Sequence, residues 1–201
     1  MKRVVDLALA ILGLVVAVPI GLLIAAAIKL DSPGPVFFVQ DRVGRDQKTF
    51  RCFKFRTMLH DVEGAAWTED DDPRVTPVGG AMRALHLDEL PQLLNVLCGE
   101  MSIVGPRPLV EGEVVLFGAL EPPYNARFAV RPGITGLAQV SVSRDDHQAK
   151  FRLDAFYVAH QSLRLDLVIM LRTIARLLRL SAAYARLARR MRRRQVAERA
   201  L

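Results

Sequence analysis

A long apolar run opens the pattern of hydrophobic and polar positions. Residues 4–28 form a stretch of 25 residues that is interrupted only by Asp6, Pro19 and two glycines. A helix needs about 20 apolar residues to cross a bilayer, so this run is long enough to do so. Pro19 lies in the run, where a proline removes a backbone hydrogen bond and favours a kink. A cleaved signal peptide fits less well, because the run is long and leads directly into the next segment.

Positive charge flanks this run on both sides, with Lys2 and Arg3 before it and Lys29 after it. Positive residues near membrane helix ends favour the cytoplasmic side, so here both ends would favour it. A helix bent at Pro19 could enter and leave the same leaflet as a re-entrant hairpin, and these residues support this and simple spanning equally. Asp6 is expected to pair with Lys2 or Arg3 at the interface instead of facing lipid.

A β-hairpin is predicted after the apolar run. Residues 31–35 are a cluster of helix breakers, where the first helix must end. Residues 36–40 are then expected to form a short strand and 41–46 a turn, and 49–55 are expected to form a partner strand because their apolar positions alternate.

The remaining pattern predicts mostly helices joined by stiff loops. The expected elements are a short helix and then a loop within 59–80, a helix over 88–97, a rigid loop at 105–108, a helix over 111–120, a loop at 131–136 and helices over most of 148–197. No internal repeat or low-complexity linker is present in the sequence.

These elements indicate an α+β fold, mostly helical, in a single membrane-associated domain. We divide the chain into an N-terminal membrane helix at 1–30, a central domain at 31–171 and a basic amphipathic helix at 172–201. In the last segment, arginines recur on one helical stripe and apolar residues on another. The arginines are Arg172, Arg176, Arg179, Arg186, Arg190 and Arg193, and the apolar residues are Leu177, Leu180, Tyr184, Leu187 and Met191. An interfacial helix shows this pattern, although a helix packed on the body or on a partner remains an alternative.

Charge is concentrated at the C-terminal end. The chain of 201 residues has a formal net charge of +7, and residues 172–201 contain ten Arg and one Glu, which leaves about −2 for residues 1–171. A uniformly basic body would suggest nucleic acid, but a basic tail beside an apolar helix suggests anionic membrane lipid. We therefore predict no nucleic-acid partner.

Cysteines and histidines add little chemistry. Cys52 and Cys98 are far apart and show no metal-binding spacing, which favours reduced thiols in a cytoplasmic compartment. The four histidines are scattered as well. His86, two residues before Asp88, is better interpreted as an ordinary exposed or capping residue than as a group that tunes that carboxylate.

Asp88 and Glu89 are the first candidates for catalysis. A helix start presents unpaired N–H groups and the positive end of the helix dipole, which hold carboxylates ionised and attract phosphate. An ionised aspartate can attack phosphorus, and a neighbouring carboxylate can help to hold Mg²⁺. Taken alone, however, the pair is better explained as an N-cap followed by a solvated first-turn glutamate.

Basic residues elsewhere change this balance. Lys54 and Arg56 follow the predicted hairpin, Arg83 precedes the carboxylates, and Arg107 and Arg131 lie beside prolines in stiff loops. Each alone fits a surface ion pair, but together they fit a diphosphate substrate and a metal. The glycine-lysine loop of P-loop nucleotide-binding proteins is absent from the sequence.

At this point the sequence resembles a known family, the monotopic phosphoglycosyl transferases or bacterial sugar transferases, and specifically the catalytic core of its longer members. The resemblance covers about Lys2 to Thr173 and rests on several motifs in order. They are Asp31-Ser32-Pro33-Gly34-Pro35-Val36-Phe37-Phe38, Gln40-x-Arg42-x-Gly44, Lys54-Phe55-Arg56-Thr57-Met58, Asp72-Pro73-Arg74-Val75-Thr76, Leu87-Asp88-Glu89-Leu90-Pro91-Gln92-Leu93, Gly99 to Pro108, and Arg131-Pro132-Gly133-Ile134-Thr135-Gly136.

The resemblance implies a reaction. Sugar-1-phosphate would pass from a UDP-sugar to a polyprenyl phosphate such as undecaprenyl phosphate, with release of UMP, as the first membrane step of glycoconjugate assembly. It implies a ping-pong course with Asp88 as covalent nucleophile, Glu89 assisting, and Mg²⁺ at the site, held by both carboxylates or by Glu89 alone. Arg131 and Pro132 would bind nucleotide, and Asp154 receives a weak substrate-binding role from an Asp-x-x-Tyr motif.

The resemblance also implies a location. It implies that the helix at 1–30 is re-entrant and bent at Pro19, and that residues 31–171 are the catalytic domain. It also implies an enzyme on the inner face of the bacterial cytoplasmic membrane, with a homodimer as one option. Two segments depart from the family pattern. Residues 141–144 replace a more usual Asn-Gly-Arg, which puts sugar or nucleotide contacts there in doubt, and Gly79-Gly80 replaces glycine followed by a basic residue.

Two alternatives remain at this stage. The chain could be a non-catalytic membrane adaptor that binds partners through its basic tail, in which case the carboxylate and arginine motifs have no explanation. It could also be a different transferase acting on the same lipid. Release of UDP instead of UMP would indicate a glycosyltransferase, because that reaction leaves the diphosphate intact.

Overall fold

The computed structural model describes residues 1–62, 72–118, 122, 124–142 and 146–179. Within them the chain is mostly helical and carries two small sheets and a long N-terminal apolar helix, as the α+β prediction expected. Arg144 and residues 180–201, which hold most of the predicted basic amphipathic helix, lie outside the described residues.

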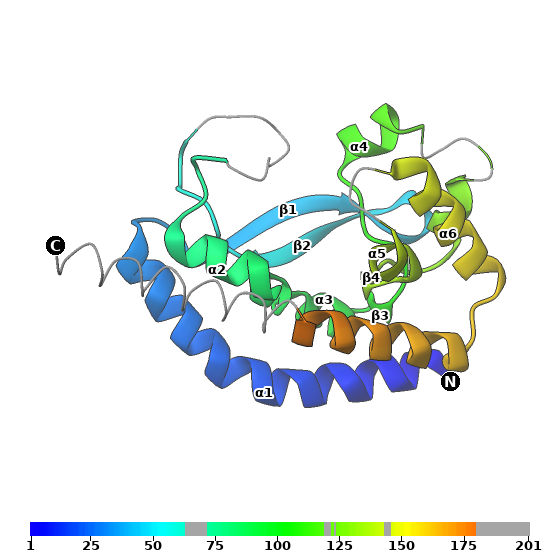
Figure 1. The fold of residues 1–201 in the computed structure, drawn as a ribbon, viewed down its shortest axis with the longest axis horizontal. Helices are drawn as coiled ribbons and strands as arrows, with labels where there is room; N and C mark the ends of the chain where they lie inside the picture. The colour runs from blue at the N-terminus through cyan, green and yellow to red at the C-terminus, as the bar shows by residue number, and fades with distance from the viewer. Residues whose placement is uncertain (63–71, 119–121, 123, 143–145, 180–201) are drawn as a thin grey trace, which may run out of the picture.

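The first helix, α1 (Lys2–Asp31), runs without a break through Pro19. Figure 1 shows it as one bent helix along an edge of the molecule. Its buried residues recur at spacings of four and seven and form one stripe against the body, namely Asp6, Ala10, Ala17, Ile24 and Ile28. Among the described residues, α1 is the one helix long and apolar enough to cross a membrane by length and composition. Its re-entrance into one leaflet stays a prediction.

Asp6 does not lie at a solvent interface. It is 4% exposed, and its carboxylate accepts hydrogen bonds from the Ser102 hydroxyl at 2.9 Å and the Ile103 amide at 3.1 Å. Lys2 Nζ lies 3.8 Å from Asp6, as expected, but it binds Asp166 more closely, at 2.7 Å. These contacts join the start of α1 to the body of the protein.

The predicted hairpin is present and is longer than expected. Strands β1 (Phe37–Val43) and β2 (Thr49–Phe55) pair antiparallel, with η1 (Arg45–Gln47) in the turn. The prediction that 41–46 form a turn is wrong for residues 41–43. There the strand is extended by tertiary contacts, because the Val43 amide donates to the Leu109 carbonyl at 2.8 Å and Arg42 donates to the Pro108 carbonyl at 3.0 Å.

The helix predicted over 88–97 is divided in the structure. Helix α2 (Pro77–Leu85) is followed by the 3₁₀ turn η2 (Leu87–Glu89) and then by α3 (Gln92–Cys98). Pro91 has no N–H with which to continue an α-helical ladder, and the backbone bonds around it span three residues.

The short helix predicted at the start of 59–80 is absent at 59–62, and residues 63–71 lie outside the described residues. Helix α2 begins at Pro77, where the end of the loop was expected. It is capped by Thr76, whose hydroxyl accepts from the Gly79 amide at 3.0 Å. Glycine is needed at position 79, because a Cβ there would lie 2.0 Å from the Thr57 carbonyl oxygen.

A short parallel sheet was not predicted. Strand β3 (Ser102–Val104) pairs with β4 (Gly133–Thr135), which lies in the segment expected to be a loop. Three-residue strands are too short to give an alternating pattern. Their pairing brings the loop at 105–108 next to the segment that begins with Arg131.

Shorter helices complete the described fold. They are α4 (Glu111–Leu116), η3 (Tyr124–Ala129), α5 (Leu137–Ser141), α6 (His147–Ala159) and a helical segment at 163–179. Helix α4 ends before the predicted residue 120, because the chain turns at Phe117 and Gly118, the latter with φ +59°. The predicted boundary at 171/172 falls inside the helical segment 163–179.

The elements form layers between α1 and the hairpin. Figure 1 shows α2 and α3 between α1 and the β1–β2 hairpin, with the segment 163–179 beside the first half of α1. One core joins Ala10 of α1, Phe50 and Cys52 of β2, and Val96 of α3. A second core packs Ile24 and Ile28 of α1 against Phe55 and Met82. Residues from the first and the last part of α1 thus both pack against strand β2 of the hairpin.

Candidate active site

Asp88 and Glu89 lie in the turn η2 between two helices. The chain reverses at His86, which ends α2 in the left-handed conformation with φ +55°. His86 is therefore the C-cap of α2, as the sequence suggested. Its left-handed backbone conformation turns the chain into the segment that carries the two carboxylates. Asp88 is buried, with 8% of its surface exposed.

Glu89 receives two cations on one oxygen. Lys54 Nζ lies 2.8 Å from Glu89 Oε1 and Arg107 Nη1 lies 3.1 Å from the same atom. Burial alone would raise the pKa of Glu89, but the charges of Arg107 and Lys54 outweigh it and hold that pKa well below its usual range. Glu89 is therefore an anion at any pH at which the protein would work.

Asp88 has the opposite tendency. Burial raises its pKa above the ordinary aspartate value, the Lys54 charge opposes this rise, and the neighbouring Glu89 charge adds to it. Lys54 Nζ lies 3.8 Å from Asp88 Oδ2, farther than from Glu89. Adjacent carboxylates whose pKa values are pushed apart are a common basis for distinct chemical roles.

Lys54 is placed by a buried amide that sequence reasoning missed. Asn95 in α3 is fully buried, accepts from the Phe53 amide at 3.1 Å and donates to the Arg51 carbonyl at 2.6 Å. Its amide also donates to Glu100 at 2.6 Å. Asn95 thus pairs with the edge of β2 on both sides of Cys52 and fixes that strand against the helix that follows the carboxylates. The available signal was a single asparagine among the leucines of an apolar helix.

Arg107 extends from the rigid loop that was predicted at 105–108. Its side chain is 47% exposed, and its main-chain carbonyl accepts a hydrogen bond from Arg127. Arg127 is itself buried and lies 3.2 Å from Asp154. Asp154 is therefore connected to the Arg107 loop through its ion pair with Arg127. Arg127 was missed from the sequence, because nothing in its local pattern shows that it is buried.

Comparison with known proteins identifies the family. The sequence profile described as bacterial sugar transferase matches residues 1–180. A UDP-N-acetylgalactosamine-undecaprenyl-phosphate N-acetylgalactosaminephosphotransferase from Aeromonas hydrophila is 44% identical over 88% of this chain and 43% of its own length. The chain belongs to the bacterial sugar transferase family.

Two further relatives show how much of a family member this chain spans. The exopolysaccharide production protein PSS of Rhizobium leguminosarum bv. phaseoli is 44% identical over 87% of this chain and 93% of its own length. A UDP-glucose:undecaprenyl-phosphate glucose-1-phosphate transferase from Caulobacter vibrioides is 44% identical over 91% of this chain and 72% of its own length. The chain thus spans less than half of the Aeromonas protein and nearly all of the Rhizobium one.

Two arginines predicted to bind substrate have structural contacts in this sugar transferase. Arg56 is 6% exposed and donates to the carbonyls of Ser32 and Pro33, so it fastens the end of β2 to the loop after α1. Arg83 Nε donates to the Thr57 hydroxyl at 2.8 Å. Substrate binding by either residue stays a prediction.

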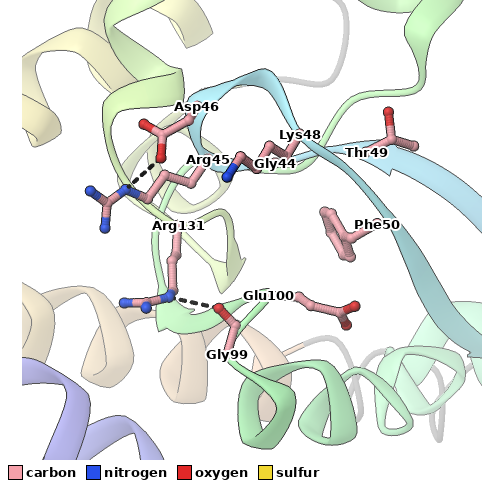
Figure 2. Close-up of a pocket in the computed structure, with 9 residues that line it drawn as sticks. All are labelled: Gly44, Arg45, Asp46, Lys48, Thr49, Phe50, Gly99, Glu100 and Arg131. Carbon is pink, nitrogen blue, oxygen red and sulfur yellow. Dashed lines mark hydrogen bonds and ion pairs between the residues drawn. The ribbon is translucent and has the colours of Figure 1, made fainter.

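Arg131 lines a pocket apart from the carboxylates. The pocket has a volume of about 390 Å³ and is bounded by the hairpin turn, the end of α3 and Arg131. Figure 2 shows Arg131 between the turn and Gly99, and its Nε donates to the Gly99 carbonyl at 2.7 Å. Pro132 contributes a carbonyl that accepts from the Ser102 amide at 2.8 Å. Asp88 and Glu89 are not among the residues that line this pocket.

The number of carboxylates at this site fits a magnesium ion. Mg²⁺ commonly binds one or two carboxylates and completes its shell with water and substrate phosphates. Asp88 and Glu89 supply two, and both ion pairs of Glu89 converge on Oε1. Among the described residues, no group of three or more His, Cys, Asp or Glu side chains is placed to hold a metal ion. A site here would therefore depend on the substrate's phosphates.

Proposed function

We propose that this sugar transferase moves a sugar-1-phosphate from a UDP-sugar to undecaprenyl phosphate and releases UMP. The observation that carries the proposal is the pair formed by the buried Asp88 and its neighbour Glu89, whose carboxylate is held by Lys54 and Arg107. The names of the Aeromonas and Caulobacter relatives describe this type of transfer for those proteins. The Rhizobium relative's name assigns that protein to exopolysaccharide production. For this chain the proposal includes the first membrane step in the assembly of an exopolysaccharide or another glycan.

The proposed course has two displacements. An Asp88 carboxylate oxygen attacks the β-phosphorus of the UDP-sugar, the bond from that phosphorus to the bridging oxygen breaks, and UMP leaves with that oxygen. A phosphate oxygen of the lipid then attacks the same phosphorus and frees Asp88. Lys54 and Arg107 lie where they can stabilise negative charge on the transferred phosphate.

Mg²⁺ is part of the proposal, held by Asp88 and Glu89 with phosphate oxygens of the substrate. When bound, it would neutralise negative charge on the diphosphate. Binding of the nucleotide by Arg131 and Pro132 also belongs to the proposal. The pocket beside Arg131 supports this role, because it combines a guanidinium with open volume.

Membrane attachment would involve two helical faces. The side of α1 that faces away from the body is apolar and exposed. The segment 163–179 adds a second exposed apolar stripe, formed by Leu163, Leu167, Leu171, Ile174 and Leu178. The ion pair between Lys2 and Asp166 holds the two helices together. We place the enzyme on the cytoplasmic face of the cytoplasmic membrane, with α1 re-entrant and anionic lipid as a binding partner.

Replacement of the proposed nucleophile tests the reaction. Asp88→Asn is expected to lower UMP release by roughly 10³-fold or more, because an amide cannot form the acyl phosphate. The measurement is a screen of UDP-sugars with undecaprenyl phosphate and Mg²⁺ in detergent or nanodiscs. Asp41→Asn, which changes an exposed aspartate of β1, is the matched control and should behave as the wild type.

The outcomes separate the candidate functions. Full turnover by Asp88→Asn would exclude the covalent assignment. Release of UDP instead of UMP would indicate a glycosyltransferase. Absence of turnover by the wild type with every nucleotide sugar tested would favour the membrane adaptor.

A further inference from the structure

The loop that carries Arg107 is fixed through three successive carbonyl groups. Each accepts a hydrogen bond from a different part of the molecule. The donors are the Gly133 amide for Pro106 at 2.9 Å, the Arg127 guanidinium for Arg107, and Arg42 Nη1 for Pro108 at 3.0 Å. The first is a backbone contact next to the small sheet, but the other two come from side chains, and one of these belongs to a buried ion pair.

That buried pair joins η3 to α6. Arg127 is 4% exposed and Asp154 is 3% exposed, with 3.2 Å between Nη2 and Oδ2. The guanidinium carbon of Arg127 also lies 4.8 Å from the centre of the Phe151 ring. Apolar residues of similar volume often replace buried ion pairs without loss of stability, because desolvation of the charges offsets their attraction. Stability alone therefore does not explain why two charges lie in this place.

The contacts of Arg127 are directed at the Arg107 loop. One nitrogen, Nη2, contacts both Asp154 and the Arg107 carbonyl. The other, Nη1, is buried without a hydrogen-bond partner in the described part of the chain. Since a guanidinium is planar and rigid, Asp154 on one side and Phe151 beneath it fix the direction in which Nη2 meets that carbonyl.

We propose that Arg127, oriented by Asp154, is a positioning residue that sets the place of Arg107 against Glu89. This inference rests on the proposed function, in which Arg107 and Glu89 belong to the transfer site. Neither Arg127 nor Asp154 contacts the carboxylate pair itself. Asp154 would therefore influence turnover through Arg127, without binding substrate as the sequence suggested.

Turnover gives the first test. Arg127→Met is expected to lower kcat for UMP release by about 100-fold with KM changed much less, because a misplacement of about 1 Å has an effect of that size. Arg127→Lys, which keeps the charge, should recover part of the loss. Arg152→Met changes an exposed arginine of α6 and should leave turnover unaltered.

A double-mutant cycle with Arg107→Ala separates positioning from general damage. Once the Arg107 side chain is absent, the change Arg127→Met should lower kcat by less than about threefold more, because its effect acts through that side chain. If the double variant instead loses kcat by the product of the two single-variant losses, the proposal is overturned.

Hydrogen exchange of the full chain gives a readout that does not need turnover. Arg127→Met should raise exchange in a peptide that covers residues 102–109 by about tenfold, while Arg152→Met leaves it unchanged. If the wild type releases no UMP, the proposed function fails and exchange still decides whether Arg127 holds the loop. Unchanged exchange in that peptide would overturn the proposal whatever the activity.

A paired variant guards against simple misfolding. Arg127→Met leaves Asp154 buried without its partner, so Arg127→Met/Asp154→Leu, which removes both charges, is measured beside it. We expect this variant to recover the thermal midpoint of the wild type while its kcat stays low. Recovery of kcat together with the midpoint would show that the pair acts only on stability.

Discussion

At the residue scale, the proposed reaction depends on two neighbouring carboxylates with different environments. Glu89 is held as an anion by Lys54 and Arg107, while burial raises the pKa of Asp88. The sequence predicted the pair and its roles, but it did not predict this asymmetry. The asymmetry arises because Lys54 approaches Glu89 to 2.8 Å and Asp88 only to 3.8 Å, distances that depend on how β2 packs against η2 and α3.

A pH dependence follows for Asp88. Only the ionised carboxylate can attack, so kcat/KM should fall as the pH is lowered through a pKa that lies above the ordinary aspartate value of 3.8. Lys54→Met removes a charge that lowers this pKa, so the acid limb should move to higher pH by about one unit or more. The measurement is the pH profile of UMP release.

The matched control for that profile is Arg51→Met, an exposed basic residue of the same strand. It should leave the acid limb in place. A limb that does not move in Lys54→Met, or that moves to lower pH, would contradict the assigned environment of Asp88.

At the element scale, the site depends on the fit between β2 and α3. The hairpin was predictable because a short apolar segment, a polar turn and the alternating segment 49–55 follow the helix breakers at 31–35, and α1 was predictable from its long apolar run. The strands β3 and β4 were not, since each has three residues and forms only with its distant partner. Asn95 and Arg127 were missed for a related reason, because burial of a polar side chain depends on contacts between distant segments.

Asn95 provides the prediction at this scale. Asn95→Leu would leave the Phe53 amide and the Arg51 carbonyl without their side-chain partner, and each buried group left unpaired costs roughly 1–3 kcal/mol. We expect a thermal midpoint lowered by several degrees and, at a temperature where the variant is folded, a reduced kcat, because Lys54 is no longer held against Glu89.

The control for this change is Leu94→Ala, which alters an exposed neighbour in the same helix. It should change the midpoint much less. An Asn95→Leu variant as stable and active as the wild type would show that strand and helix are held by other contacts.

At the scale of the whole molecule, α1 lies along the body over its full length. Its buried stripe contacts the layer that contains α2, α3 and β3, and its other face is exposed and apolar. Spanning would carry one end of α1 to the far side of the membrane, whereas cores at both of its ends join the same body. This packing supports the re-entrant arrangement.

Labelling from one side of the membrane tests that arrangement. Cys52 and Cys98 are first replaced by alanine, and two variants then each receive one new cysteine, inserted directly after Met1 or substituted for Lys29. Both should react with an impermeant maleimide added to the cytoplasmic side, which faces outward in inverted vesicles. A cysteine at exposed Leu12, within the apolar face, should not react. Reaction of the two end positions from opposite sides would show that α1 spans the membrane.

Asp88 is proposed to carry the phosphosugar between two displacements, and trapping that covalent intermediate tests the proposed reaction. The wild-type chain is mixed with Mg²⁺ and a UDP-sugar labelled in the β-phosphate, without undecaprenyl phosphate. We expect release of up to one equivalent of UMP and label on the peptide that contains Asp88, and we expect this label to be lost when the lipid phosphate is added. Release of UMP only in the presence of that lipid, with no labelled peptide, would contradict the proposed reaction.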